Sequence, residues 1–72
     1  MTAAQLQLKL GRRCRTLRHE RGLSQLDIVR KFEFSLSHYQ KIERGDLDPR
    51  LSTLRRLAEC FDVNLSKFFE GI

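Results

Sequence analysis

The chain has few cysteines and no long hydrophobic run, and these absences exclude several classes of protein. Its two cysteines, Cys14 and Cys60, are too few and too far apart for a disulfide framework or a four-ligand zinc site, and the two histidines do not repair that spacing. The amino terminus lacks the apolar segment of a signal peptide, and no run approaches the length that spans a membrane. We therefore expect free thiols in a reducing cytoplasm, no metal site and no contact with a membrane.

The sequence also lacks a catalytic constellation. No pair of carboxylates, no nucleophile with a base and no cluster of ligands stands at a meaningful spacing, and the glycine pattern of a phosphate-binding loop is absent. At 72 residues the chain is too short to surround a substrate or to hold a second catalytic or sensory domain. We expect a single domain over residues 1–72, with its core at about residues 6–70, that is not an enzyme and needs no cofactor.

What the chain has in excess is positive charge. Fourteen Lys and Arg against nine Asp and Glu give a formal net charge of +5, and a polyanion is the natural partner of so basic a small protein. A merely basic and soluble surface is the alternative. With 40% of its residues hydrophobic and 32% charged, the composition is typical of a folded globular protein. The charge therefore favours a polyanionic partner, and only a sequence motif can decide between this interpretation and a merely basic surface.

Hydrophobic periodicity predicts helices throughout and no strands. The first helix is expected over about residues 6–21, and Gly22 is expected to end it. Its apolar face, which puts a cysteine in the core, consists of Leu6, Leu10, Cys14 and Leu17. Ser24 and Asp27 have the spacing of a capping box at the start of a second helix, which runs to about Lys31.

Only three residues, 33–35, connect the second helix to the third. Ser35 can cap this third helix, and Tyr39 and Ile42 lie on its inner face. Two helices joined by so short a turn must cross steeply, as they do in a helix-turn-helix unit. Gly45 is expected to end the third helix, and Pro49 lies in the loop that follows.

Two further helices are predicted after this loop. Asn64 is expected to cap the short fifth helix, which carries Leu65, Phe68 and Phe69. The apolar stripe of the fourth helix consists of Leu51, Leu54, Leu57, Ala58 and Phe61. The predicted fold class is all-α, a compact five-helix bundle in which helices 2 and 3 form the helix-turn-helix.

Five short motifs resemble the phage-repressor type of helix-turn-helix domain, the Xre/Cro-like family, from about Leu10 to Phe69. Each stands at the family's spacing, and together they are Leu17-Arg18, Gly22-Leu23-Ser24-Gln25, Ile42-Glu43-Arg44-Gly45, Pro49 and Leu57-Ala58. The resemblance implies a lambda-repressor-like domain that binds double-stranded DNA with its third helix in the major groove.

The chain departs from the family pattern at three positions. The family usually has a small residue where Val29 stands, a glycine where Glu33 stands and a serine-like cap where Arg50 stands. Val29 is expected to push the two crossing helices slightly apart. If Glu33 must adopt a left-handed conformation, it costs about 1 kcal/mol relative to glycine. These departures affect local geometry and leave the fold expectation intact.

The face of the third helix opposite Tyr39 is polar and cationic, and the resemblance implies that it reads bases. In the major groove Gln40 can pair bidentately with adenine, and Lys41 can reach guanine acceptors. Ser37 can donate or accept, and Leu36 can pack against a thymine methyl group. A merely solvated helix face is the alternative.

The resemblance also implies contacts with the DNA backbone. Gln25 lies in the first turn of the second helix, where free amides and the helix dipole favour a phosphate. The other candidate phosphate contacts are Ser35, His38, Arg44 and Arg50. Of these, His38 could be inert and Arg50 could be simply solvated.

In the family, residues at the positions of Arg18 and Glu43 form an ion pair between the first and third helices. Such a pair would orient the third helix. Two unrelated surface charges are the alternative. The other arginines of the first helix spread around three sides of it, and most are expected to be solvated; they are Arg12, Arg13 and Arg15.

The expected function is a sequence-specific transcription regulator, a repressor or controller that binds a two-fold symmetric operator as a homodimer and is associated with a chromosome or plasmid. The carboxyl-terminal residues, Phe68 included, offer more apolar surface than a short helix needs for its own core. The expected dimer interface is Cys60, Leu65, Phe69 and Ile72. The alternative is an antitoxin-type module that binds a protein partner and regulates its own promoter, and a neighbouring toxin gene would identify it.

Overall fold

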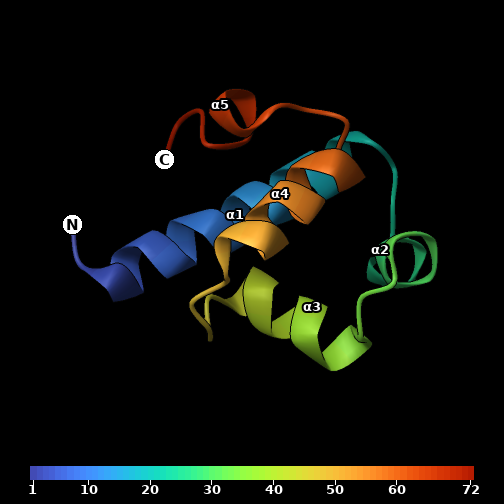
Figure 1. Ribbon diagram of the computed structural model, residues 1–72, viewed down its shortest axis with the longest axis horizontal. Helices are drawn as coiled ribbons and strands as arrows, with labels where there is room; N and C mark the ends of the chain where they lie inside the picture. The colour runs from blue at the N-terminus through green and yellow to red at the C-terminus, as the bar shows by residue number, and fades with distance from the viewer.

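The computed structural model describes residues 1–72 and contains five helices and no strands. The helices are α1 (Ala3–Glu20), α2 (Gln25–Phe32), α3 (Leu36–Arg44), α4 (Leu51–Cys60) and α5 (Leu65–Phe68). The predicted all-α fold is therefore confirmed. In Figure 1, α1 runs along the molecule behind α4, with α2 and α3 below and to the right of them and α5 above. α3 packs against both α1 and α2, and α2 also contacts α4.

Local side-chain caps explain where most of these helices begin. Ser24 and Asp27 form the expected capping box of α2, and Ser35 and Asn64 cap α3 and α5. α1 begins three residues earlier than the apolar stripe indicates, because Thr2 caps it in a second capping box. Arg50 starts α4 without a side-chain cap. Polar caps thus define ends that apolar periodicity alone misses.

The core receives side chains from all five helices and from Phe34 in the turn between α2 and α3. Its largest fully buried side chains are Tyr39, Phe61, Phe68, Ile28, Ile42, Leu57 and Cys14. Cys14 is a core residue, as expected, and Cys60 is buried as well, with 6% of its surface exposed. Both thiols are free, and burial raises the pKa of Cys14 above its usual range and that of Cys60 to about 12. Cys60 therefore has little exposed surface to contribute to the expected dimer interface.

Two leucines of the predicted apolar stripes lie outside the core. Leu6 is 41% exposed and Leu51 is 73% exposed. The amino-terminal part of α1, to which Leu6 belongs, projects beyond the other helices in Figure 1. Leu51 is the first residue of α4, directly after the loop that contains Pro49. Periodicity correctly assigns a helix here, but it does not show how far the packing partners extend.

Two backbone features position α3 against its neighbouring helices. A Cβ at Gly11 of α1 would lie 2.7 Å from the carbonyl oxygen of Ile42 and closer still to that of Glu43, so only glycine lets α1 and α3 approach so closely. Between α2 and α3, Glu33 adopts the left-handed conformation with φ 58°, as its place in the family pattern anticipates. Val29 packs half-buried against the core.

Arginines bind the carboxyl-terminal ends of three helices. Arg13 donates to the carbonyls of Phe68 and Lys67 at 2.9 Å each, which ties α5 to α1. Arg21 donates to the carbonyl of Phe61 at 2.8 Å, just after α4. Arg56 donates to the last residue of α2. A cation at this end of a helix is favourable because the last carbonyls are unpaired. Arg13 is thus a packing residue, and it is one of the first-helix arginines that are not simply solvated.

Candidate nucleic-acid interface

The two faces of α3 differ as the sequence predicts. Tyr39 and Ile42 on the inner face are 0% and 1% exposed. On the outer face Ser37 and Lys41 are exposed, Leu36 is 38% exposed and Gln40 is half-buried. The four candidate base contacts, Leu36, Ser37, Gln40 and Lys41, therefore lie on one accessible surface at the beginning and middle of the helix.

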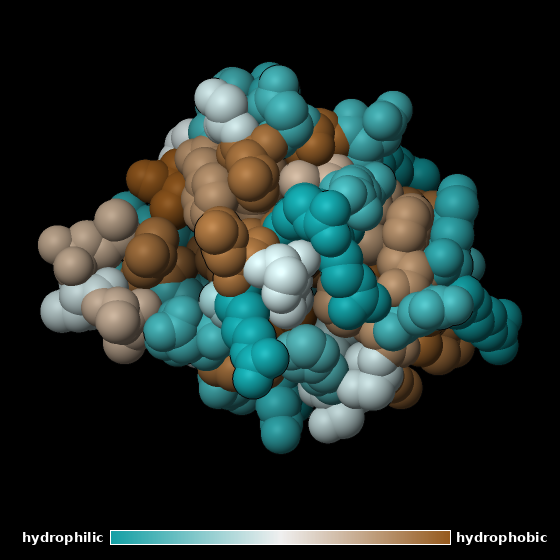
Figure 2. All heavy atoms as spheres, viewed as in Figure 1, coloured by the Kyte–Doolittle hydropathy of each residue, from teal (hydrophilic) through white to brown (hydrophobic).

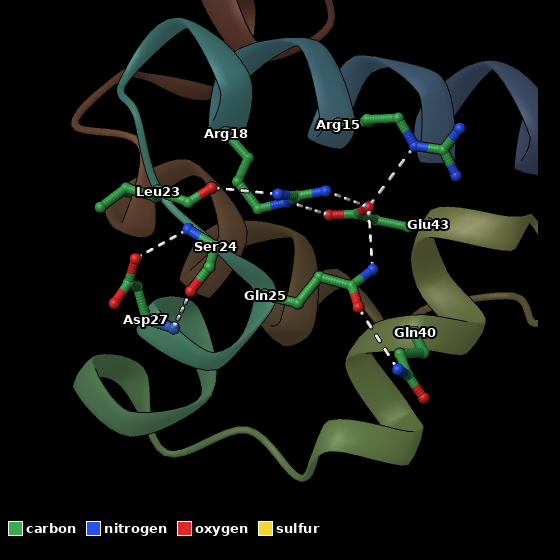
Figure 3. Close-up of polar contacts among 8 residues, drawn as sticks. All are labelled: Arg15, Arg18, Leu23, Ser24, Gln25, Asp27, Gln40 and Glu43. Carbon is green, nitrogen blue, oxygen red and sulfur yellow. Dashed lines mark hydrogen bonds and ion pairs between the residues drawn. The ribbon is translucent and has the colours of Figure 1, made fainter.

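The structure brings Arg18 of α1 and Glu43 of α3 together in a buried, bidentate ion pair. The Arg18 Nε and Nη2 atoms donate to the two Glu43 carboxylate oxygens at 2.7 and 3.0 Å (Figure 3). Arg18 is 8% exposed and Glu43 is 4% exposed. A third guanidinium nitrogen, Nη1, donates to the carbonyl of Leu23 at 3.0 Å, just before α2. The pair therefore links α1, α3 and the start of α2.

The electrostatics keep both members of the pair charged. Burial opposes ionisation of Glu43, but hydrogen bonds from its neighbours, with Arg18 the strongest, hold its pKa below its ordinary value. The bond with Glu43 raises the pKa of Arg18. Tyr39 lies beside the pair, and burial together with the Glu43 carboxylate raises its pKa. The Tyr39 hydroxyl is the one buried side-chain polar atom without a hydrogen bond of good geometry.

Two glutamines extend this network to the surface of α3. Gln25 donates its Nε2 to Glu43 at 3.2 Å, and Gln40 donates its Nε2 to the Gln25 Oε1 at 3.3 Å. An ionised carboxylate only accepts hydrogen bonds, so Gln25 must turn its NH2 group toward Glu43 and its oxygen toward Gln40. Gln40 must then use one N–H on Gln25. Its carbonyl oxygen and second N–H remain free, and Figure 3 shows the oxygen pointing away from the network.

The side chains of Gln25 and Arg15 make contacts with Glu43 that the sequence pattern does not predict. The Gln25 side chain is half-buried and forms hydrogen bonds with both Glu43 and Gln40. Arg15 places its Nε 3.6 Å from Glu43 while 53% of its side chain stays exposed. Arg15 stands three residues before Arg18, on the same side of α1. The spacing of three residues between Arg15 and Arg18 is the feature of the sequence that could have predicted the contact between Arg15 and Glu43.

The remaining candidates for phosphate contact are spread around α3. Arg44 is 57% exposed and forms an ion pair with Asp46 at 2.9 Å. The Ser35 hydroxyl is occupied as the cap of α3, accepting from the His38 backbone at 3.1 Å. His38 and Arg50 line one polar hollow of about 460 Å³ with Thr53 and the beginning of α4. No side chain caps the first amides of α4, which lie beside this hollow.

The comparisons with known proteins agree with this geometry. A family model described as a helix-turn-helix domain matches residues 9–66. The chain belongs to this helix-turn-helix family. The resemblance to phage-repressor-type domains is thereby confirmed, because two curated relatives are a transcription regulator and a phage repressor.

These two relatives of the helix-turn-helix domain are longer proteins. The HTH-type transcriptional regulator DdrOP3 of Deinococcus deserti is 37% identical over 65 residues, which make up 90% of this chain and 50% of that protein. The immunity repressor protein of Bacillus phage phi105 is 34% identical over 59 residues, or 82% of this chain and 41% of that protein. The chain thus spans half or less of the length of the curated relatives it matches.

Solved structures of helix-turn-helix proteins have the same fold. The restriction-modification controller protein C.AhdI from Aeromonas hydrophila matches with a TM-score of 0.87 and 28% identity, over 96% of this chain and 100% of that chain. An HTH_3 family transcriptional regulator from Vibrio cholerae matches with a TM-score of 0.86 and 28% identity, over 94% of this chain and 38% of that chain. The domain therefore has the fold of DNA-binding transcription regulators.

Two other kinds of site are not found in this helix-turn-helix domain. Nowhere do three or more His, Cys, Asp or Glu side chains gather so that they could hold a metal ion. None of the five helices combines the length and the hydropathy needed to cross a bilayer.

Proposed function

We propose that this domain binds double-stranded DNA in a sequence-specific manner, with α3 in the major groove, and acts as a repressor or controller of transcription. The orientation of Gln40 carries the proposal. Its free oxygen and its second N–H present one acceptor and one donor side by side, which is the pattern that adenine matches with N6–H and N7. Because Gln25 and Glu43 fix the amide, the donor and acceptor do not have to be ordered on binding.

The other exposed residues of α3 complete the reading surface. Lys41 follows Gln40 and is exposed, so its ammonium group can reach guanine acceptors. Ser37 and Leu36 lie one turn earlier, where the hydroxyl can meet a base edge and the leucine a thymine methyl group. Each good bidentate contact discriminates between bases by about 1–3 kcal/mol.

Phosphate contacts would surround this surface. Gln25 would contribute its backbone amide at the start of α2, since its side chain is engaged in the network. Arg50 and His38 would act beside the uncapped beginning of α4, and Arg44 would exchange Asp46 for a phosphate. Ser35 would position these groups as the cap of α3. Such contacts set affinity and register rather than sequence preference.

A homodimer is the second part of the proposal. One module of this size buries too little surface for tight and selective binding, and two-fold symmetric half-sites are the usual solution. An apolar groove of about 150 Å³ lies between α1, the α3–α4 loop and the carboxyl-terminal residues, lined among others by Leu6, Leu54 and Phe69. Figure 2 shows hydrophobic atoms gathered over the beginning of α4 and the end of the chain. We propose that the partner subunit covers this groove and that the exposed Leu65 and the half-buried Ile72 extend the interface.

Selection of bound duplexes from a random pool, followed by a salt titration of the best binder, tests the proposal. We expect a two-fold symmetric site whose half-sites contain an A·T pair recognised by Gln40. The best duplex should be preferred over random duplexes by about 10³-fold or more at physiological salt. Equal binding of random and selected duplexes at that salt would contradict sequence-specific regulation.

A further inference from the structure

The turn of the helix-turn-helix needs support from outside itself. Glu33 has φ 58° and ψ 38°, a left-handed conformation that residues other than glycine rarely adopt. Only residues 33–35 separate α2 from α3, so the backbone angles at Glu33 set the direction in which α3 leaves α2. A turn built on an unfavourable conformation stays in place only if surrounding contacts hold it.

Arg56 of α4 supplies such contacts. Its Nη2 donates to the carbonyl of Phe32 at 2.7 Å and to that of Glu33 at 3.2 Å. The same guanidinium lies over the ring of Phe34, with its central carbon 4.3 Å from the ring centroid. One side chain thus contacts three consecutive residues of the turn, and its charge lies at the favourable end of α2.

The contacts continue from the turn into α3. Phe34 is 5% exposed and packs edge-on against Tyr39, with 5.9 Å between the ring centroids. The Phe34 ring also lies 5.9 Å from the ring of His38. Arg56 therefore touches a residue that packs against both the inner face and the flank of α3.

We infer that Arg56 is a positioning residue for DNA recognition. It holds the left-handed turn at Glu33 and thereby the angle at which α3 meets the major groove. The inference rests on the proposed binding of DNA by α3. Its structural consequence, the order of the turn, can nevertheless be measured in the absence of DNA.

The test compares Arg56→Met with Arg55→Met. Both substitutions remove one positive charge from α4, but Arg55 is exposed and makes none of the contacts with the turn. Hydrogen exchange is followed at the amides of His38 and Tyr39, which bond to Ser35 in the first turn of α3. We expect Arg56→Met to accelerate this exchange by about tenfold, and Arg55→Met to leave it unchanged, under conditions where both proteins are folded.

Binding to DNA separates positioning from simple stabilisation. Arg56→Met should reduce the ratio of affinities for selected over random duplexes by about tenfold, whereas Arg55→Met should weaken both duplexes alike. Adding Glu33→Gly to Arg56→Met should restore the ratio and the slow exchange, because glycine adopts the left-handed conformation without help. If Arg56→Met alone does not fold, Arg56→Lys is measured in the same assays, because lysine keeps the charge but lacks the planar N–H donors of the guanidinium.

Two results would overturn the inference. One is that the Arg56 variant and the Arg55 variant give the same exchange rates and the same affinity ratio. The other is that Glu33→Gly restores neither quantity, since the role of Arg56 would then lie elsewhere than in the turn. A wild-type protein that prefers no duplex would contradict the proposed function instead, and the exchange measurement would still decide whether Arg56 holds the turn.

Discussion

Changing Glu43 to Gln should strongly destabilise the domain, because it leaves the guanidinium of Arg18 buried opposite a neutral amide. Arg18 is 8% exposed and Glu43 is 4% exposed, so water cannot replace the missing charge. Breaking a buried ion pair by removing one partner costs about 3–5 kcal/mol. A domain of this length has a total stability of only about 4–11 kcal/mol, so the variant should be close to unfolding at elevated temperature.

A double-mutant cycle isolates the pair from its surroundings. Arg18→Met alone should destabilise as much as Glu43→Gln alone, since each leaves the partner's polar groups unpaired. The double variant should be more stable than the sum of the two losses implies, with a coupling energy of about 2 kcal/mol. Urea denaturation measures the free energy of unfolding of the two single variants and the double variant, provided that the dependence of that free energy on urea concentration is the same for all three. Strict additivity would refute the reasoning that these residues stabilise the fold as a pair.

The same pair predicts how stability depends on pH. The pKa of Glu43 is lower in the folded state than its ordinary value of 4.5. Its contribution is therefore fully present above that value and is lost as the pH falls through the folded pKa. Asp27, whose pKa is lowered by its bonds with Ser24, acts in the same direction but is exposed. As the pH falls, the free energy of unfolding should therefore decrease more steeply for the wild type and for Asp27→Asn than for Glu43→Gln. If the three proteins instead lose stability in parallel as the pH falls, Glu43 is not ionised in the folded state.

Three further substitutions test packing, charge and assembly. Gly11→Ala should cost about 2–3 kcal/mol in urea denaturation, because its Cβ meets the α3 backbone, whereas Gly22→Ala, with open space around it, should cost about 1 kcal/mol. Asp46→Asn should raise affinity for all duplexes alike by about two- to fivefold in a titration at constant salt, because it releases Arg44. Phe69→Glu should convert a dimer into a monomer in sedimentation at micromolar concentration, while Leu26→Glu, outside the groove, should not. An equal cost at both glycines, an unchanged affinity, or a wild type that is already monomeric would contradict the respective prediction.

The parts of the fold that depend on local chemistry could be predicted from the sequence. The apolar periodicity predicts every helix, and the caps at Ser24, Ser35 and Asn64 lie where the pattern of side chains puts them. The two faces of α3 also follow from periodicity alone. The pairing of Arg18 with Glu43 depends on contact between distant helices, and only the resemblance to a family pointed to it.

What the sequence could not predict depends on contacts between distant segments. Gly11 has no side chain that could indicate how closely α1 approaches α3. Nothing in the sequence indicates that Arg13 and Arg56 each bind the carbonyls at the end of a helix far away in the sequence. The positive charge that suggested a polyanion is therefore partly used within the fold. The orientation of Gln40 likewise follows from a network that three helices assemble.

The most direct test of the central claim compares the duplexes selected by Gln40→Ala and Lys41→Ala with those selected by Arg44→Ala. If α3 reads bases through its outer face, each of the first two variants should relax the choice of one or two base pairs in every half-site. Arg44→Ala should keep the selected sequence, weaken binding to all duplexes alike and make the slope of affinity against salt shallower by about one unit for each phosphate that the variant no longer neutralises. An unchanged site for Lys41→Ala together with an altered site for Arg44→Ala would show that α3 does not lie in the groove in this orientation.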